Sequence, residues 1–172
     1  MREQMELAAL MPTIREVIDA GGVFRLYPRG KSMLPLLVEG EDSIELGAAE
    51  PYAVGDALLY RRENGQFVLH RLIAVQKDGL VFCGDHQRDL EYGVPKSAVL
   101  AKMCGYYKGE VHHTVEEADY LRYTAERVAR FPWIFRKSKA AYNLYRHITP
   151  LHTLPSRAGH KLLRMLKIEK QK

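Results

Sequence analysis

The sequence predicts a mainly β protein, in which an antiparallel β core carries a short N-terminal helix and a helical, basic C-terminal extension. Between about residues 23 and 107, short apolar runs alternate with turn-forming residues, as is typical of a closed or folded-over antiparallel β domain. On either side of that region, apolar and charged residues mix with helical spacing. We therefore expect three parts, residues 1–22, 23–113 and 114–172.

The N-terminal part predicts a helix over residues 3–20, which Gly21-Gly22 ends and Pro12 interrupts. This segment is rich in acids and lacks the basic region followed by an apolar run that marks a secretion signal. No stretch of the chain reaches the roughly 18 apolar residues needed to span a bilayer. We expect a cytoplasmic protein without a transmembrane anchor.

Six segments predict the strands of the core. Asn64-Gly65 and Asp78-Gly79 are hairpin signals between them, because glycine accepts a positive φ at little cost. The candidate strands are VFRLYP (23–28), SIEL (43–46), DALLYRR (56–62), FVLHRLIAV (67–75), LVFCGD (80–85) and VLAKMCGYY (99–107).

After about residue 114 the pattern is helical, over residues 115–131, 136–148 and 156–170, with prolines between the pieces. The hydrophobic fraction of 47% and the charged fraction of 27% are those of a globular protein. Cys83 and Cys104 belong to no Cys-x-x-Cys pair, which indicates small buried apolar residues rather than metal ligands or a disulfide. We expect no metal and no cofactor.

The segment that carries chemistry is GKSMLP at residues 30–35. A serine beside glycine suits a close approach of the backbone to a substrate, but its hydroxyl is a weak nucleophile until a base takes its proton. Of the seven histidines, His70 lies inside the strong strand pattern at residues 67–75, which would hold its ring rigidly. Arg71 follows it directly, and a Gly84-Asp85 turn comes later.

These boxes resemble the signal peptidase I and LexA-like serine peptidase superfamily. The resemblance covers residues 23–108 and consists of five boxes in family order, GKSMLP (30–35), GEDSIEL (40–46), YAVGD (52–56), VLHRLI (68–73) and FCGD (82–85). It implies a LexA/signal-peptidase-like β core and a serine endopeptidase with Ser32 as nucleophile and His70 as general base. Such an enzyme would cleave a peptide or precursor protein after a small residue.

The base distinguishes branches of this superfamily. Because a histidine rather than a lysine precedes Arg71, the chain is similar to the archaeal, endoplasmic-reticulum and sporulation signal peptidases. A histidine with its ordinary pKa near 6.5 is suited to neutral pH, so we expect activity to rise through roughly pH 6–7.

The resemblance also implies an acid, in or after the Gly-Asp box, that orients the histidine. Asp85 is our first candidate and Asp89 the second, and Glu91 is also near in the sequence. The Ser32 backbone N–H would be one oxyanion donor, and the sequence does not identify the second.

The substrate groove is also implied by the family motif, with the substrate adding as an extended strand to a sheet edge. Gly30 lies in the close approach to the substrate, and Met33 and Pro35 would shape the groove wall.

Acidic and basic residues are unevenly distributed along the chain. Residues 1–119 hold 13 Lys and Arg against 19 Asp and Glu, whereas residues 120–172 hold 13 against 2. Peripheral binding to an anionic membrane from its inner face, with Trp133 and Phe135 inserting at the headgroups, is one interpretation. An ordinary helix pair packed on the core, with a basic solvated face, is the other. We do not expect a nucleic-acid partner, since a basic patch alone is sequence-blind and no helix-turn-helix precedes the core.

Two alternatives to a peptidase acting on other proteins stay open. The groove could recognise a peptide without cutting it, as a non-catalytic binding module. The chain could also cut itself once, as a single-turnover autoprotease, at Ala48-Ala49 or Ala158-Gly159.

Overall fold

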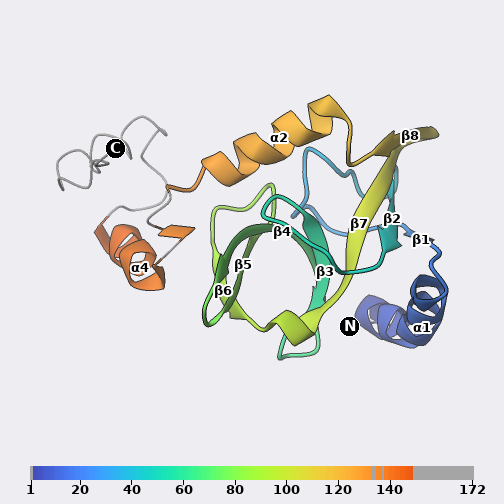
Figure 1. Ribbon diagram of the computed structural model, residues 1–172, viewed down its shortest axis with the longest axis horizontal. Helices are drawn as coiled ribbons and strands as arrows, with labels where there is room; N and C mark the ends of the chain where they lie inside the picture. The colour runs from blue at the N-terminus through green and yellow to red at the C-terminus, as the bar shows by residue number, and fades with distance from the viewer. Residues whose placement is uncertain (1, 133–134, 137, 149–172) are drawn as a thin grey trace. The chain divides into compact units, whose positions relative to one another are not determined.

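An eight-stranded antiparallel sheet dominates the computed structural model, which describes residues 2–132, 135–136 and 138–148 (Figure 1). The strands are β1 (Phe24–Leu26), β2 (Ser43–Gly47), β3 (Ala57–Arg61), β4 (Phe67–Gln76), β5 (Gly79–Cys83), β6 (Glu91–Val94), β7 (Val99–Lys108) and β8 (Val111–Thr114). The helices are α1 (Arg2–Asp19), the short 3-10 helix η1 (Lys96–Ala98), α2 (Ala118–Ala129) and α4 (Lys139–Ile148). The prediction of a mainly β protein with an N-terminal helix is confirmed.

The strands follow the order β1-β2-β7-β3-β4-β5-β6, with β8 paired to β7. All six predicted strands are present, and the Asn64-Gly65 and Asp78-Gly79 turns join β3 to β4 and β4 to β5. Strands β6 and β8 were not predicted. Each has four residues, too few to show a period of two above the surrounding loop.

The two faces of the sheet bury separate apolar clusters, because alternate residues of a strand point to opposite faces. From β3, Ala57 and Leu59 join the cluster beneath the Ser32 loop, whereas Leu58 and Tyr60 join one that contains Phe82. Strands β3, β4, β5 and β6 curl around this second cluster (teal to green in Figure 1). Burial on both faces explains why β3 and β5 are nearly continuous apolar runs rather than alternating ones.

Helix α1 continues through Pro12, where the sequence predicted an interruption. Proline removes one backbone hydrogen bond and crowds the preceding turn. Packing offsets this cost, because Ile14 is fully buried and Leu7, Met11 and Ile18 lie against the core. Burial of one such side chain contributes about 1.5–3 kcal/mol.

The chain forms two compact units, residues 1–129 and 130–172. Helix α2 therefore belongs to the same unit as the sheet, and this unit ends at Ala129. In the described part of the second unit, Phe135 is buried and its ring meets Tyr142 edge-on, with centroids 5.9 Å apart.

The remaining predictions for the C-terminal segment concern Trp133 and the helix over residues 156–170, which lie outside the described residues. None of the helices within the described ranges has the length and apolar character that crossing a membrane requires.

Candidate active site

The loop between β1 and β2 holds Ser32 over the apolar core. Met33, Leu36 and Leu37 are buried in that core, and the Leu37 N–H donates to the Met33 carbonyl over 3.0 Å. Gly30 has a φ of 88°, which other residues rarely adopt, and lets the chain turn just before the serine. The GKSMLP string therefore specifies a tight turn whose apolar side chains fix the serine in place.

The turn after β5 packs directly on Ser32. The His86 N–H donates to the Ser32 carbonyl over 2.9 Å. A Cβ on Gly84 would lie only 2.7 Å from that same carbonyl oxygen, so this close approach requires glycine. The order of the boxes in the sequence thus corresponds to a contact in space between the serine loop and the Gly-Asp turn.

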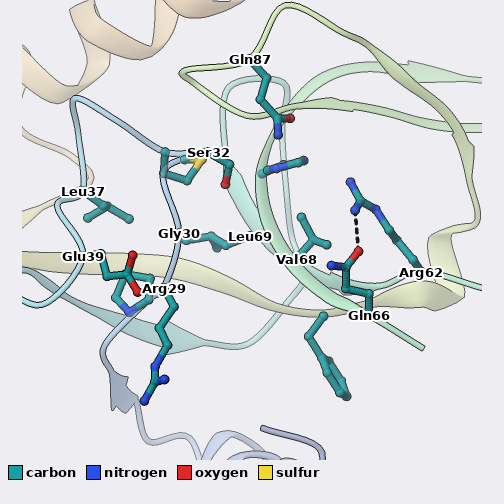
Figure 2. A pocket seen from close by; sticks show the side chains of 14 residues that line it. Arg29, Gly30, Ser32, Leu37, Glu39, Arg62, Gln66, Val68, Leu69 and Gln87 are labelled. Carbon is teal, nitrogen blue, oxygen red and sulfur yellow. Dashed lines mark hydrogen bonds between the residues drawn. The ribbon is translucent and has the colours of Figure 1, made fainter. Parts of the chain in front are cut away.

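Ser32 and His70 line one cavity of about 230 Å³. In Figure 2, Ser32 and Gln87 lie toward one end of it, and Arg29 and Glu39 toward another. Within the described residues no hydrogen bond joins Ser32 to His70, as is common in active sites before substrate binds. The lining residues are Pro28, Arg29, Gly30, Ser32, Met33, Leu37, Glu39, Arg62, Gln66, Phe67, Val68, Leu69, His70 and Gln87.

Two of the three predicted groove residues, Gly30 and Met33, line this cavity. Pro35 is exposed and lies outside the lining. Pro35 does not line the cavity because the chain after Met33 follows the core, in which Leu36 and Leu37 are buried.

His70 is 2% exposed, and its Nδ1 lies 3.2 Å from the Tyr60 hydroxyl. That hydroxyl donates to Glu91 Oε2 over 2.7 Å. Arg62 donates to both oxygens of Glu91, from Nε over 2.8 Å and from Nη2 over 2.6 Å. Arg62 also donates to Gln66, the dashed line in Figure 2. A chain of contacts therefore runs from the imidazole through a phenol to an ion pair.

Burial and then the positive charge of Arg62 lower the pKa of His70 to about 4, against the opposing charges of Glu91 and Asp85. Burial favours the neutral form of Glu91, but hydrogen bonds from Arg62 and Tyr60 outweigh it and lower the pKa of that carboxyl. The ground state is thus a neutral imidazole near an ionised carboxylate.

The sequence led us to expect Asp85 on His70, but the structure places Asp85 on a different residue. Its two oxygens accept from Arg71 Nε and Nη2 over 2.7 and 2.6 Å, and the Tyr123 hydroxyl donates to it over 3.0 Å. Successive residues of a strand face opposite sides of the sheet, so His70 and Arg71 point apart. The Asp85 carboxylate goes with Arg71, which is fully buried.

The other two candidate acids differ in position. Asp89 is exposed in the loop between β5 and β6. Glu91, at the start of β6, has an oxygen 4.0 Å from His70 Nδ1, too far for a hydrogen bond. Glu91 is therefore the acid that the fold brings to the imidazole, with the Tyr60 hydroxyl between them.

Sequence reasoning missed Tyr60, Arg62 and Gln87. A signal for Tyr60 was available, because the Asn64-Gly65 hairpin sets Leu58 opposite His70 and makes Tyr60 a diagonal neighbour. Gln87 lines the cavity from the loop after the Gly-Asp turn, where no regular pattern predicts side-chain direction.

Within the described ranges, no group of three or more His, Cys, Asp or Glu side chains lies close enough together to hold a metal ion. The site consists of a serine, a histidine and hydrogen-bonding side chains. No model of a known protein family matches the sequence, and no curated protein matches it either.

Proposed function

We propose that this chain is a serine endopeptidase similar to the LexA-like and signal-peptidase-like enzymes, with Ser32 as nucleophile and His70 as general base. One observation carries the proposal: two residues far apart in the sequence line one cavity, and the Gly-Asp turn fixes the backbone of the serine. A buried, neutral imidazole that lines the same cavity as a serine is the pair of groups that nucleophilic acyl transfer needs.

In this mechanism Ser32 Oγ attacks the carbonyl carbon of the scissile peptide, and its proton passes to His70. The proton goes to Nε2, because Nδ1 faces Tyr60. The imidazolium then protonates the leaving amine as the carbon–nitrogen bond breaks. A water molecule, deprotonated by the same nitrogen, hydrolyses the acyl-enzyme and regenerates the serine.

The oxyanion formed during attack needs donors, and the Ser32 backbone N–H is the first. Gln87 is our candidate for the second donor, because its side chain lines the same cavity. Its amide lies close to Gly84, where a Cβ would be 3.0 Å from Gln87 Oε1 and 2.7 Å from the Ser32 carbonyl. We assign the Gln87 amide N–H to this role.

A substrate strand can pair with β4 at Leu69. The N–H of Leu72 donates to Asp56 on the β3 side, and backbone direction alternates along a strand, so Leu69 turns its N–H and C=O away from β3. Strand β5 pairs with β4 only from Arg71 onward. Among the described strands β3 is the single neighbour of β4 at Leu69, and the opposite edge borders the cavity.

The expected substrate is a peptide or precursor protein that is cleaved after a small residue. We further propose a cytoplasmic location, with peripheral binding to the inner face of an anionic membrane through the basic C-terminal segment. Sedimentation of the full chain with anionic and with neutral liposomes tests this membrane contact. Equal retention of the protein by both kinds of liposome would contradict the proposed binding to anionic lipid.

The test of the activity is mass spectrometry of a diverse peptide library at pH 7.5, with and without anionic liposomes. Cuts made by the wild type should disappear in Ser32→Ala and in His70→Ala. Ser97→Ala and His112→Ala are matched controls, because both positions are exposed and outside the cavity lining. Cuts that persist in Ser32→Ala would contradict the proposal.

Two further readouts separate the alternatives. A binding module would retain peptides on Ser32→Ala and on the wild type alike, without cleavage by either. A single-turnover autoprotease would instead shorten its own intact mass on standing, and only when Ser32 is present.

A further inference from the structure

The two contacts of the Tyr60 hydroxyl, with Glu91 and with His70, fix the direction of its hydrogen bonds. A phenol has one proton to donate, and an ionised carboxylate can only accept. The pKa of Glu91 is lowered, chiefly by hydrogen bonds from Arg62 and Tyr60 against the effect of burial, so Glu91 carries no proton to offer. The Tyr60 proton therefore lies in the 2.7 Å contact with Glu91 Oε2.

The Tyr60 oxygen can then only accept from His70 Nδ1, 3.2 Å away. This requires the imidazole proton to be on Nδ1 and leaves the lone pair on Nε2. A general base needs that lone pair on the nitrogen that meets the serine hydroxyl. Tyr60 itself stays protonated, because burial and then the hydrogen bond to Glu91 raise its pKa.

We propose that Tyr60, held by Glu91, keeps His70 in the tautomer protonated on Nδ1 and is a positioning residue of this site, an inference that rests on the proposed peptidase function. In a Ser–His–acid triad a carboxylate accepts directly from Nδ1. Here a phenol does so, and the carboxylate acts one bond further away. Arg62 completes the arrangement by holding both oxygens of Glu91.

Burial supports a dedicated role for this contact chain. Tyr60 is fully buried and stacks on Phe82 at 4.3 Å between centroids, with 18° between the ring planes. The phenol therefore cannot rotate to another partner without disturbing the core. Arg62, which lines the cavity, and its partner Glu91 keep about 30% of their side-chain surface exposed (31% and 27%).

Glu91→Gln is the sharpest test, because it keeps the shape and reverses the polarity. The Arg62 donors would take the amide oxygen, which directs the amide NH₂ at the Tyr60 oxygen. Tyr60 would then donate to His70 Nδ1 and move the imidazole proton to Nε2. We expect kcat to fall by about 10²- to 10⁴-fold with KM little changed, as for a catalytic histidine in the wrong tautomer.

Tyr60→Phe removes the acceptor while the ring still fills its place in the core. The imidazole should then populate both tautomers, and kcat should fall by at least about tenfold. Tyr107 and Glu45 offer a matched pair outside the cavity lining, because the Tyr107 hydroxyl donates to Glu45 Oε1 over 3.3 Å. Tyr107→Phe and Glu45→Gln should leave kcat and KM unchanged.

The deciding measurement is nitrogen NMR of the histidine side chains of the full chain, with His70 assigned by its loss in His70→Asn. We expect a protonated Nδ1 in the wild type, a protonated Nε2 in Glu91→Gln and a mixture in Tyr60→Phe. The control pair should keep the wild-type spectrum of His70. Thermal unfolding of each variant shows whether it is folded under these conditions.

The outcomes separate the tautomer from the peptidase function, because the NMR experiment needs no substrate. A wild type protonated on Nε2, or a His70 spectrum that neither variant changes, overturns the inference even if peptides are cut. Variants that switch tautomer yet keep wild-type kcat also overturn the positioning role. If the spectra are as expected but the protein cleaves no peptide, the tautomer assignment is supported and the proposed peptidase function is contradicted.

Discussion

At the level of single residues, the carboxylates of Asp85 and Glu91 have separate partners. Asp85 neutralises Arg71, and this pair is buried together with the Tyr120 and Tyr123 hydroxyls. Burial opposes the charged guanidinium, but the hydrogen bonds and charge of Asp85 outweigh it and raise the pKa of Arg71. The role of Asp85 is therefore the stability of the fold behind the site.

Asp85→Asn should destabilise the protein by about 3–5 kcal/mol, because it leaves the guanidinium buried without a counter-charge. Asp119→Asn is the matched control, since Asp119 also pairs with an arginine, Arg122, but in an exposed position. That surface pair is worth about 0–1 kcal/mol. Urea unfolding measures both, and equal losses would contradict the assignment.

The pH dependence of activity depends on the environment of His70. A protonated imidazole cannot accept the proton of Ser32, so kcat/KM falls as the pH drops through the pKa of this histidine. Burial and then the charge of Arg62 lower that pKa to about 4, against the opposing charges of Glu91 and Asp85. The other group that faces the imidazole is the phenol of Tyr60, at Nδ1. The acid limb should therefore lie near pH 4, not between 6 and 7 as the sequence suggested.

The measurement is kcat/KM of the best library peptide from pH 3.5 to 8, with unfolding followed over the same range. Arg62→Gln removes the charge that lowers the pKa, so its acid limb should move upward. A limb that stays between pH 6 and 7 in the folded wild type would show that His70 is not desolvated in solution.

At the level of elements, the site depends on three pieces of chain that meet. The loop before β2 supplies Ser32, β4 supplies His70, and the turn after β5 binds the serine carbonyl. The same turn carries Asp85, which is fixed by Arg71 of β4. Strand β4 and the turn therefore fix the positions of His70 and Ser32 relative to one another.

Gly84→Ala should lower kcat by about 10²-fold, because its Cβ would meet the Ser32 carbonyl at 2.7 Å and displace the nucleophile. Position 84 requires glycine because there is no space for a Cβ, not because the backbone there has a positive φ. Gly47→Ala is the control, since its Cβ would find its nearest atom, the sulfur of Cys104, at 3.4 Å. Steady-state kinetics checks both, and equal rates would mean that the turn can shift freely.

At the level of the whole molecule, the first compact unit includes α2. This helix brings Tyr120, which is 5% exposed, against the core, and its Tyr123 hydroxyl reaches Asp85. The unit ends at Ala129, so the basic charge excess of residues 120–172 is divided between this helix and the second unit.

A chain that ends at Ala129 should keep the unfolding midpoint and the cleavage activity of the first unit. A chain that ends at residue 113 should lose several kcal/mol, because removal of one buried aromatic side chain alone costs about 3–5 kcal/mol. Urea unfolding and the peptide assay compare the two. Equal stability of both chains would show that α2 is an appendage, as the sequence first suggested.

The sequence alone determined the local features of this protein. Short apolar runs and the Asn-Gly and Asp-Gly turns between them specify β3, β4 and β5, because these signals lie within a few neighbouring residues. The glycine beside Ser32 and the strand around His70 identify the candidate nucleophile and base in the same way. Whether they act as a peptidase remains a prediction that the experiments above test.

Only the tertiary structure decided which groups surround His70. Asp85, Asp89 and Glu91 are near one another in the sequence, but strand alternation turns Arg71, and with it Asp85, away from the imidazole. Glu91 reaches His70 only through Tyr60, a contact made across separate strands of the curled sheet. Packing between distant segments fixes Asp85 on Arg71 and Glu91 on Tyr60, and no local pattern of residues records these two contacts.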